Sequence, residues 1–171
     1  MEPGHALVTG AGEGVERISL PPMTLVLAPR DTGLSTARVY AEADRLGTTR
    51  ARLDPRRLRE LSRAETLEEL APSCENDLEP AALSLRPELA GLARRLGEAG
   101  AAAALVSGSG PTVVGAFADP GAAARAAVEI EGAIVTGLGS VAEREDDAAD
   151  SLEGGRARAA TPRRLAEADG R

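Results

Sequence analysis

Aromatic residues are almost absent from this sequence of 171 residues, which contains one Tyr, one Phe and no Trp. Because 43% of the residues are nevertheless hydrophobic, a core must be built mainly from Ala, Val, Leu and Ile. The length suits one domain with a core of its own, and leaves room for a tail. We therefore expect one domain followed by a tail.

Lys is absent, so all 20 cationic residues are Arg, and 27 Asp and Glu residues give a net charge of -7. An acidic chain rarely presents the broad basic face that neutralises nucleic-acid phosphates. We therefore expect no nucleic-acid partner.

Cysteine and histidine occur once each. Cys74 cannot form an internal disulfide and has no Cys or His near it in sequence, so we expect a buried structural thiol and no metal site. No run of about 18 apolar residues could span a bilayer, and the first residues lack the pattern of a signal peptide. These features predict a cytoplasmic protein without membrane contact.

The first residues favour a β-hairpin. Two short apolar runs, at 5–9 and 15–20, flank Gly10-Ala11-Gly12-Glu13-Gly14. The spacing of these glycines also occurs in phosphate loops, but such loops open a helix, whereas the residues after Gly14 have the pattern of a strand. We therefore favour the hairpin for residues 1–22.

The rest of the chain alternates between strand and helix patterns. Strands are expected at 23–28, 101–106, 112–118 and 133–136, the first of them central. Helices are expected from Ser35 or Thr36 to 46, from Asp54-Pro55, from 76–80, at 87–98, and at 121–131 after Asp119. This order predicts an α+β fold, an antiparallel sheet with helices mainly on one face, of the ferredoxin-like split βαβ type. The domain should span residues 23–139.

The last residues, 140–171, are charged and rich in Ala, with few large apolar side chains. Burial cannot offset the entropy of ordering such a segment. We expect a disordered tail that does not pack on the domain.

One glycine-rich loop, Ser107-Gly108-Ser109-Gly110-Pro111-Thr112, is a candidate site. Its two glycines allow successive peptide N–H groups to form an anion-binding concavity, to which hydroxyl groups can add donors. Spacing alone supports equally well a turn that only links two strands.

A second candidate is the helix that carries Thr36 and Tyr40, because residues four apart share one helix face. A lone aromatic residue in a helix is more often part of the core. Asn76-Asp77 is first a helix-capping signal. The sequence shows no Ser-His-Asp set, paired carboxylates or metal-spaced ligands, so we assign no catalytic and no metal-binding residue.

Three motifs in this order are more specific: Gly33-Leu34-Ser35-Thr36-Ala37-Arg38-Val39-Tyr40, Asn76-Asp77-Leu78-Glu79 and Val106-Ser107-Gly108-Ser109-Gly110-Pro111-Thr112. Together they resemble the C-terminal half of the 4-diphosphocytidyl-2-C-methyl-D-erythritol kinases, a family of the GHMP kinase superfamily. The resemblance runs from about residue 4 to residue 137. It implies the C-terminal domain of a GHMP kinase at 23–139, preceded by a hairpin remnant of the N-terminal kinase domain at 1–22.

The resemblance implies ATP-dependent phosphorylation of a cytidine diphosphate-linked methylerythritol, a small-molecule substrate, in non-mevalonate isoprenoid-precursor synthesis. Tyr40 would stack on the cytosine and Thr36 would line the substrate cleft. Ser107, Gly108, Ser109, Gly110 and Thr112 would form a loop beside the phosphates. Magnesium normally accompanies the ATP in this family.

The family's main ATP loop, its N-terminal Lys and its catalytic Asp all precede the part that is matched. We therefore expect this chain alone to bind neither ATP nor magnesium and to be inactive. A free-standing, non-catalytic α+β binding module is the alternative. A homoserine or mevalonate-type substrate is disfavoured by Tyr40, because a stacking ring is useful when a base is bound. The oligomeric state stays open.

Overall fold

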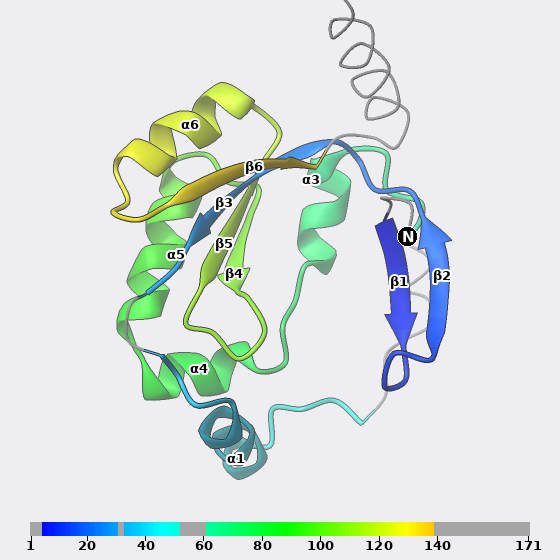
Figure 1. Cartoon of the computed structure of the whole chain (residues 1–171), viewed down its shortest axis with the longest axis vertical. Coiled ribbons are helices and arrows are strands. Elements are labelled where there is room, and N and C mark those ends of the chain that lie inside the picture. The colour runs from blue at the N-terminus through cyan, green and yellow to red at the C-terminus, as the bar shows by residue number, and fades with distance from the viewer. Residues whose placement is uncertain (1–4, 31–32, 52–60, 139–171) are drawn as a thin grey trace, which may run out of the picture.

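The four-stranded sheet is the centre of the fold, and it is antiparallel with the order β4-β5-β3-β6 (Figure 1). The computed structural model describes residues 5–30, 33–51 and 61–138. The strands are β3 (Met23–Ala28), β4 (Ala103–Val106), β5 (Val113–Phe117) and β6 (Ile134–Leu138). The predicted fold class, the central place of β3 and the β4–β5 pairing are confirmed.

The helices that follow β3 begin and end close to the predicted positions. They are α1 (Thr36–Leu46), α4 (Glu79–Leu85), α5 (Glu88–Glu98) and α6 (Pro120–Val128). Gly47 ends α1 in the left-handed conformation, with φ of 66°, and its N–H donates to carbonyls of the last turn. Asp119 caps α6 because its carboxylate accepts hydrogen bonds from the N–H groups of Gly121 and Ala122.

Two expectations cannot be compared with the structure. The start of the helix expected from Asp54-Pro55 falls in residues 52–60, and the expected tail falls in residues 139–171. Both segments lie outside the described residues.

A short helix, α3 (Leu67–Leu70), continues into the 3₁₀ helix η1 (Ala71–Ser73), and neither was singled out in the sequence. The Thr66 hydroxyl caps α3 by accepting a hydrogen bond from the N–H of Glu69 at 3.3 Å. A Thr followed three residues later by Glu is a known start signal for helices. This signal could have revealed α3.

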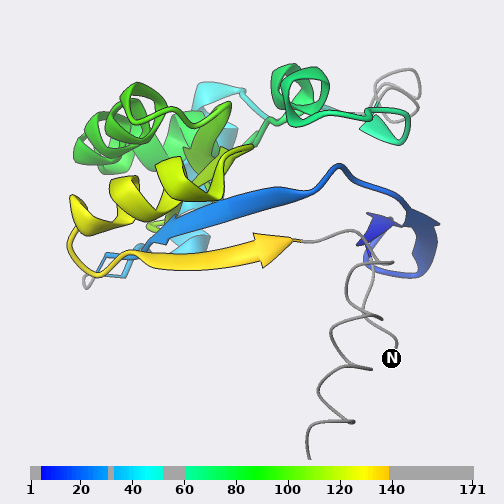
Figure 2. The same ribbon diagram turned by 90° about the horizontal axis from the view of Figure 1, so that it is seen from above.

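The main core lies between one face of the sheet and the helices α5 and α6, which Figure 2 shows on the same side of β3 and β6. Alternate residues of β3 and β5 point to this side, which explains their burial. The largest fully buried side chains of this core are those of Phe117, Leu89, Leu96, Val26, Val106 and Val113. Helices thus cover one face of the sheet, as predicted.

The opposite face of the sheet is covered in part by α3. Leu67 and Leu70 pack with Met23 and Ala116, and partly buried side chains such as Leu25 join them. These strand residues alternate with those of the main core, so α3 lies on the other side of the sheet. The description of helices mainly on one face therefore holds for α5 and α6, with α3 as the exception.

The N-terminal hairpin is a separate two-stranded sheet of β1 (His5–Thr9) and β2 (Gly14–Ile18). It stands beside the four-stranded sheet in Figure 1 and is mostly exposed. The His5 imidazole accepts a hydrogen bond from the N–H of Leu20 through Nδ1, at 3.3 Å. The hairpin reading of the glycine-rich connection is confirmed.

None of the helices in the described ranges combines the length and the apolar character needed to cross a membrane.

We predict that Leu96→Ala lowers the free energy of unfolding by about 2–5 kcal/mol, because it leaves a cavity beneath β5. Urea denaturation of the 171-residue chain measures this change. Val128→Ala, on the exposed face of α6, is the control and should stay within about 0.5 kcal/mol of the wild type. Similar losses in both variants would contradict the proposed core.

Candidate functional site

The loop Ser107–Thr112 joins β4 to β5 as a tight turn. The N–H of Ser107 donates to the Thr112 carbonyl at 2.8 Å, and the N–H of Gly110 donates to the Ser107 carbonyl at 2.9 Å. Gly108 and Gly110 have φ values of 55° and 77°, a region that side chains other than glycine rarely adopt. The conformation of the loop therefore depends on both glycines.

The backbone of this loop has free donors. In the part of the chain that the structure describes, the N–H groups of Gly108 and Ser109 donate to no acceptor. Ser107 and Gly108 are exposed, and Ser109 is half-buried. Two free N–H groups beside two serine hydroxyls have the chemistry of an anion-binding turn.

Helix α1 reaches this loop at its first residue. The hydroxyl oxygens of Thr36 and Ser109 lie 3.0 Å apart, within hydrogen-bond distance, although 73 residues separate them in sequence. Tyr40 is one turn further along and 53% exposed. Tyr40 is therefore not part of the core, and the alternative prediction of a core aromatic residue is wrong. No hydrogen bond joins Tyr40 to the loop in the described residues.

The middle of α1 is fixed to α4. Val39 and Ala43 are buried against Ala81, and the Ser84 hydroxyl of α4 donates a hydrogen bond of 2.6 Å to Glu42. Arg45 also donates to the Glu42 carboxylate, at 2.6 and 2.7 Å. The Arg45 guanidinium, and after it the Ser84 hydroxyl, lower the pKa of Glu42 to about 2.

Two side chains hold the loop, that of Asn76 before α4 and that of Glu79 at the first residue of α4. The amide of Asn76 donates to the carbonyls of Val106 and Gly108, both at 2.8 Å, and its oxygen accepts from the N–H of Leu78 at 3.0 Å. Glu79 accepts a hydrogen bond of 2.9 Å from the N–H of Val106. The sequence indicated a capping role for Asn76 but did not indicate these contacts with the loop.

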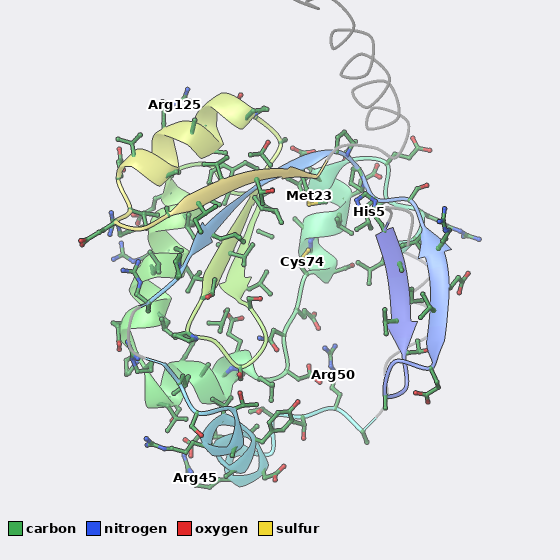
Figure 3. The ribbon with its side chains drawn as sticks, in the orientation of Figure 1. His5, Met23, Arg45, Arg50, Cys74 and Arg125 are labelled. Atoms are coloured by element: carbon green, nitrogen blue, oxygen red, sulfur yellow. The ribbon has the colours of Figure 1, made fainter. Side chains whose placement is uncertain are left out.

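Arg50, labelled in Figure 3, joins the end of α1 to the same segment. Its guanidinium forms ion pairs of 2.6 Å with Asp77 and with Glu75, and its N–H donates to Asp77 at 3.1 Å. Hydrogen bonds from Arg50 lower the pKa of the Asp77 carboxyl. The segment between η1 and α4 is thus anchored on one side to the loop and on the other to the residues after α1.

A groove of about 500 Å³ opens beside the loop. Side chains of the sheet form its apolar wall, and Asn76, Ser107 and Gly108 also line it. The apolar wall consists of Leu25, Leu27, Leu105 and Val114. Neither Thr36 nor Tyr40 lines this groove, so a single cleft that borders the loop, Thr36 and Tyr40 stays a prediction.

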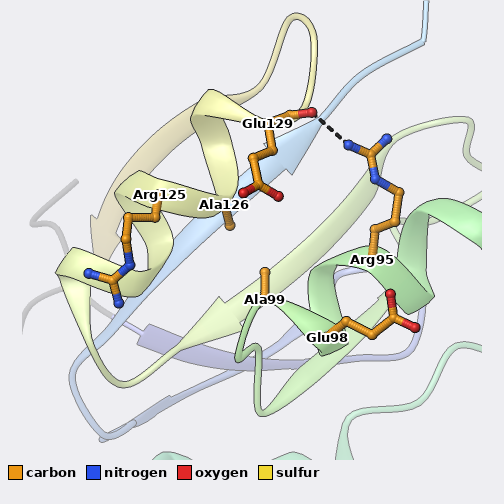
Figure 4. A pocket seen from close by; sticks show the side chains of 6 residues that line it. All are labelled: Arg95, Glu98, Ala99, Arg125, Ala126 and Glu129. Atoms are coloured by element: carbon orange, nitrogen blue, oxygen red, sulfur yellow. Dashed lines mark hydrogen bonds between the residues drawn. The ribbon is translucent and has the colours of Figure 1, made fainter.

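A second hollow, of about 380 Å³, lies between α5 and α6 (Figure 4). Two cationic side chains, Arg95 and Arg125, and two acidic residues, Glu98 and Glu129, line this hollow. Arg95 donates a hydrogen bond of 2.6 Å to the Glu129 carbonyl. None of its residues belongs to α1, α4 or the loop. We therefore do not assign it to the candidate site.

Cys74 does not belong to the candidate site. The thiol is half-buried rather than fully buried as expected, it donates to the Leu70 carbonyl at 3.7 Å, and burial raises its pKa. The described residues contain no group of three or more His, Cys, Asp or Glu placed to hold a metal ion. The candidate site therefore consists of the loop, α1, and the Asn76 and Glu79 side chains that bind the backbone of Val106 and Gly108.

We predict that Glu42 stabilises the fold only above its folded pKa. Because that pKa is about 2 and the ordinary value is 4.5, the contribution is complete above 4.5 and is lost as the pH falls from 4.5 towards 2. Melting temperatures of the wild type and Glu42→Gln between pH 7 and 2 should therefore converge at low pH. A difference that stays constant down to pH 2 would exclude this role.

The GHMP kinases C terminal family matches residues 57–134. The 4-diphosphocytidyl-2-C-methyl-D-erythritol kinase of Pelotomaculum thermopropionicum is 39% identical over 117 residues, which cover 68% of this chain and 40% of that protein. The enzyme of the same name from Mycolicibacterium gilvum is 42% identical over 138 residues, which cover 76% of this chain and 42% of that protein. The chain thus spans about 40% of the length of these relatives.

Solved structures agree with these matches. A crystal structure of 4-(cytidine 5'-diphospho)-2C-methyl-D-erythritol kinase is 30% identical with a TM-score of 0.63, and the match covers 78% of this chain and 49% of that one. A homoserine kinase from Cytophaga hutchinsonii shares the fold, with 17% identity, a TM-score of 0.58, and coverage of 81% and 49%. The chain therefore contains a GHMP kinase C-terminal domain and is related to the C-terminal half of the 4-diphosphocytidyl-2-C-methyl-D-erythritol kinases.

Proposed function

We propose that this chain is the C-terminal, substrate-side part of an ATP-dependent kinase that phosphorylates 4-diphosphocytidyl-2-C-methyl-D-erythritol in non-mevalonate isoprenoid-precursor synthesis. The observation that carries the proposal is the 3.0 Å approach of Thr36 to Ser109. It brings the start of the helix that bears Tyr40 against the glycine-rich loop. A base and a phosphate of one ligand could therefore be recognised by neighbouring parts of this domain.

On the base side, we assign cytosine stacking to Tyr40 and a place in the substrate cleft to Thr36. The two residues are four apart on α1, so they share one face of the helix. The Tyr40 ring is half exposed, as a stacking platform for a base must be before the base binds. The names of the relatives describe kinases of a compound that carries a cytidine diphosphate group, and this supports a ligand with a base.

On the phosphate side, we assign the loop of Ser107, Gly108, Ser109, Gly110 and Thr112. Its free N–H groups and serine hydroxyls suit a phosphate, while the nearby Asn76 amide is already used by backbone carbonyls. ATP, with magnesium, would supply the phosphoryl group. We assign no catalytic residue and no metal ligand in this chain, and we place the ATP-binding function in the part of the kinase that lies outside the matched region.

We predict that Tyr40→Ala raises the KM for the cytidine substrate about 5- to 150-fold, which corresponds to a stacking energy of about 1–3 kcal/mol. The measurement uses a hybrid kinase in which the N-terminal half of the Mycolicibacterium gilvum relative precedes this chain. Tyr40→Phe is the matched control and should keep the wild-type KM, because the phenyl ring still stacks. Equal effects of the two substitutions would count against stacking.

We also predict that the 171-residue chain alone shows no ATP-dependent phosphorylation of 4-diphosphocytidyl-2-C-methyl-D-erythritol, whereas the hybrid does. Phosphoryl transfer depends on groups that position and stabilise the phosphates, and removing one such group typically costs about 10²–10³ in rate. A coupled assay for ADP release compares the two proteins. Activity of the chain alone would refute the assignment of ATP binding to another region. A folded but inactive hybrid would favour the non-catalytic module.

A further inference from the structure

The strand before the loop lies at the edge of the sheet, and its last residue turns its polar backbone groups outward. The N–H of Ser107 pairs with the Thr112 carbonyl of the neighbouring strand. In an antiparallel pair, successive residues direct their N–H and C=O groups to opposite sides. The N–H and C=O of Val106 therefore point away from β5, to the side on which β4 has no neighbouring strand among the described residues.

Both outward groups of Val106 are bound by side chains near the start of α4. Glu79 accepts from the N–H at 2.9 Å, and the Asn76 amide donates to the carbonyl at 2.8 Å. These two bonds replace the missing partner strand at the point where the chain leaves the sheet. They hold the entrance of the loop at a fixed position relative to α4.

The same Asn76 amide also binds the carbonyl of Gly108, at 2.8 Å. In a trans peptide the C=O and the following N–H point in opposite directions, so this bond turns the N–H of Ser109 away from Asn76. That N–H is one of the two free donors of the loop. Asn76 therefore determines where the donor points.

The contacts of Asn76 require a side-chain amide. Its nitrogen gives two hydrogens to two carbonyls, while its oxygen accepts from the N–H of Leu78. A carboxylate has no hydrogen to donate, and a hydroxyl has only one. The sequence contains no Gln and no second Asn, so this amide is unique in the chain.

We propose that Asn76 is a positioning residue which, together with Glu79, holds the loop 107–110 so that its free N–H groups face a bound phosphate. Asn76 itself does not touch the ligand and acts through the backbone of Val106 and Gly108. The identity of the ligand rests on the proposed function. The fixed direction of the N–H groups rests only on the hydrogen bonds of this domain.

The test compares two reciprocal substitutions of adjacent residues, Asn76→Asp and Asp77→Asn. Asn76→Asp keeps the size of the side chain and the oxygen that accepts from Leu78, but it places an oxygen against the two carbonyls. Asp77→Asn weakens the ion pair with Arg50 and leaves the Asn76 amide in place. In the described residues the side-chain contacts of Asp77 go to Arg50 and not to the loop, and an Asn at this position keeps an oxygen that accepts from Arg50, so Asp77→Asn serves as the matched control.

In the 171-residue chain, hydrogen–deuterium exchange should become faster at Ser107 and Gly110, the loop residues whose N–H groups are hydrogen-bonded, in Asn76→Asp and stay unchanged in Asp77→Asn. In the hybrid kinase, Asn76→Asp should lower kcat about 10- to 100-fold, because small displacements of a positioning group have effects of this size. The KM for the cytidine substrate should rise as well, because the loop is assigned to a phosphate of the same ligand. Asp77→Asn should leave both constants within about threefold of the wild type.

A second pair of variants keeps the test valid if Asn76→Asp fails to fold. Glu79→Ala removes only the bond to the N–H of Val106 and should also speed exchange in the loop, while Glu79→Gln retains an accepting oxygen and should restore protection. Wild-type exchange in both Asn76→Asp and Glu79→Ala, or equal kinetic effects of Asn76→Asp and Asp77→Asn, would overturn the proposal. An inactive wild-type hybrid would instead count against the proposed function, and the exchange data would still decide whether Asn76 orders the loop.

Discussion

Packing of α5 and α6 on one face of the sheet fixes the register of β4 against β5, and with it both ends of the loop between them. Phe117 and Leu96 fill this interface, and a Cβ at Gly115 would come within 3.0 to 3.3 Å of both side chains. A slip of one residue would turn the buried side chains of β5 to the opposite face. The loop that follows β4 therefore starts from a strand with only one stable pairing.

The fold could be predicted to a large extent because its signals are local. Leu89, Leu92 and Leu96 mark the buried face of α5 by their spacing, and Gly47 marks the end of α1. The strand ends were predicted less accurately, since β4 begins at Ala103 and not at the predicted Ala101. A run of four alanines does not show where pairing starts, because alanine fits a loop and a strand about equally well.

The candidate site was predictable only in its parts. Glycines drew attention to the loop, because few other residues tolerate its positive φ values. The approach of Thr36 to Ser109 and the bonds of Asn76 span 73 and about 30 residues, and no sequence spacing predicts such contacts. The sequence around Asn76 indicates a capping role, because capping depends on neighbours in sequence. The contacts of its amide with Val106 and Gly108 involve residues that come about 30 positions later in the chain.

The contacts around α4 make the two sides of the candidate site parts of one unit. Helix α1 is attached at its start to Ser109, in its middle to Ser84 of α4, and after its end to Asp77. The segment that carries Asp77 also holds the loop through Asn76. A displacement of α1 relative to the loop would break hydrogen bonds and ion pairs in several places at once. Since catalysis by positioning needs reacting groups held at fixed separations, this shared anchoring suits a domain that presents one part of a substrate to chemistry at another.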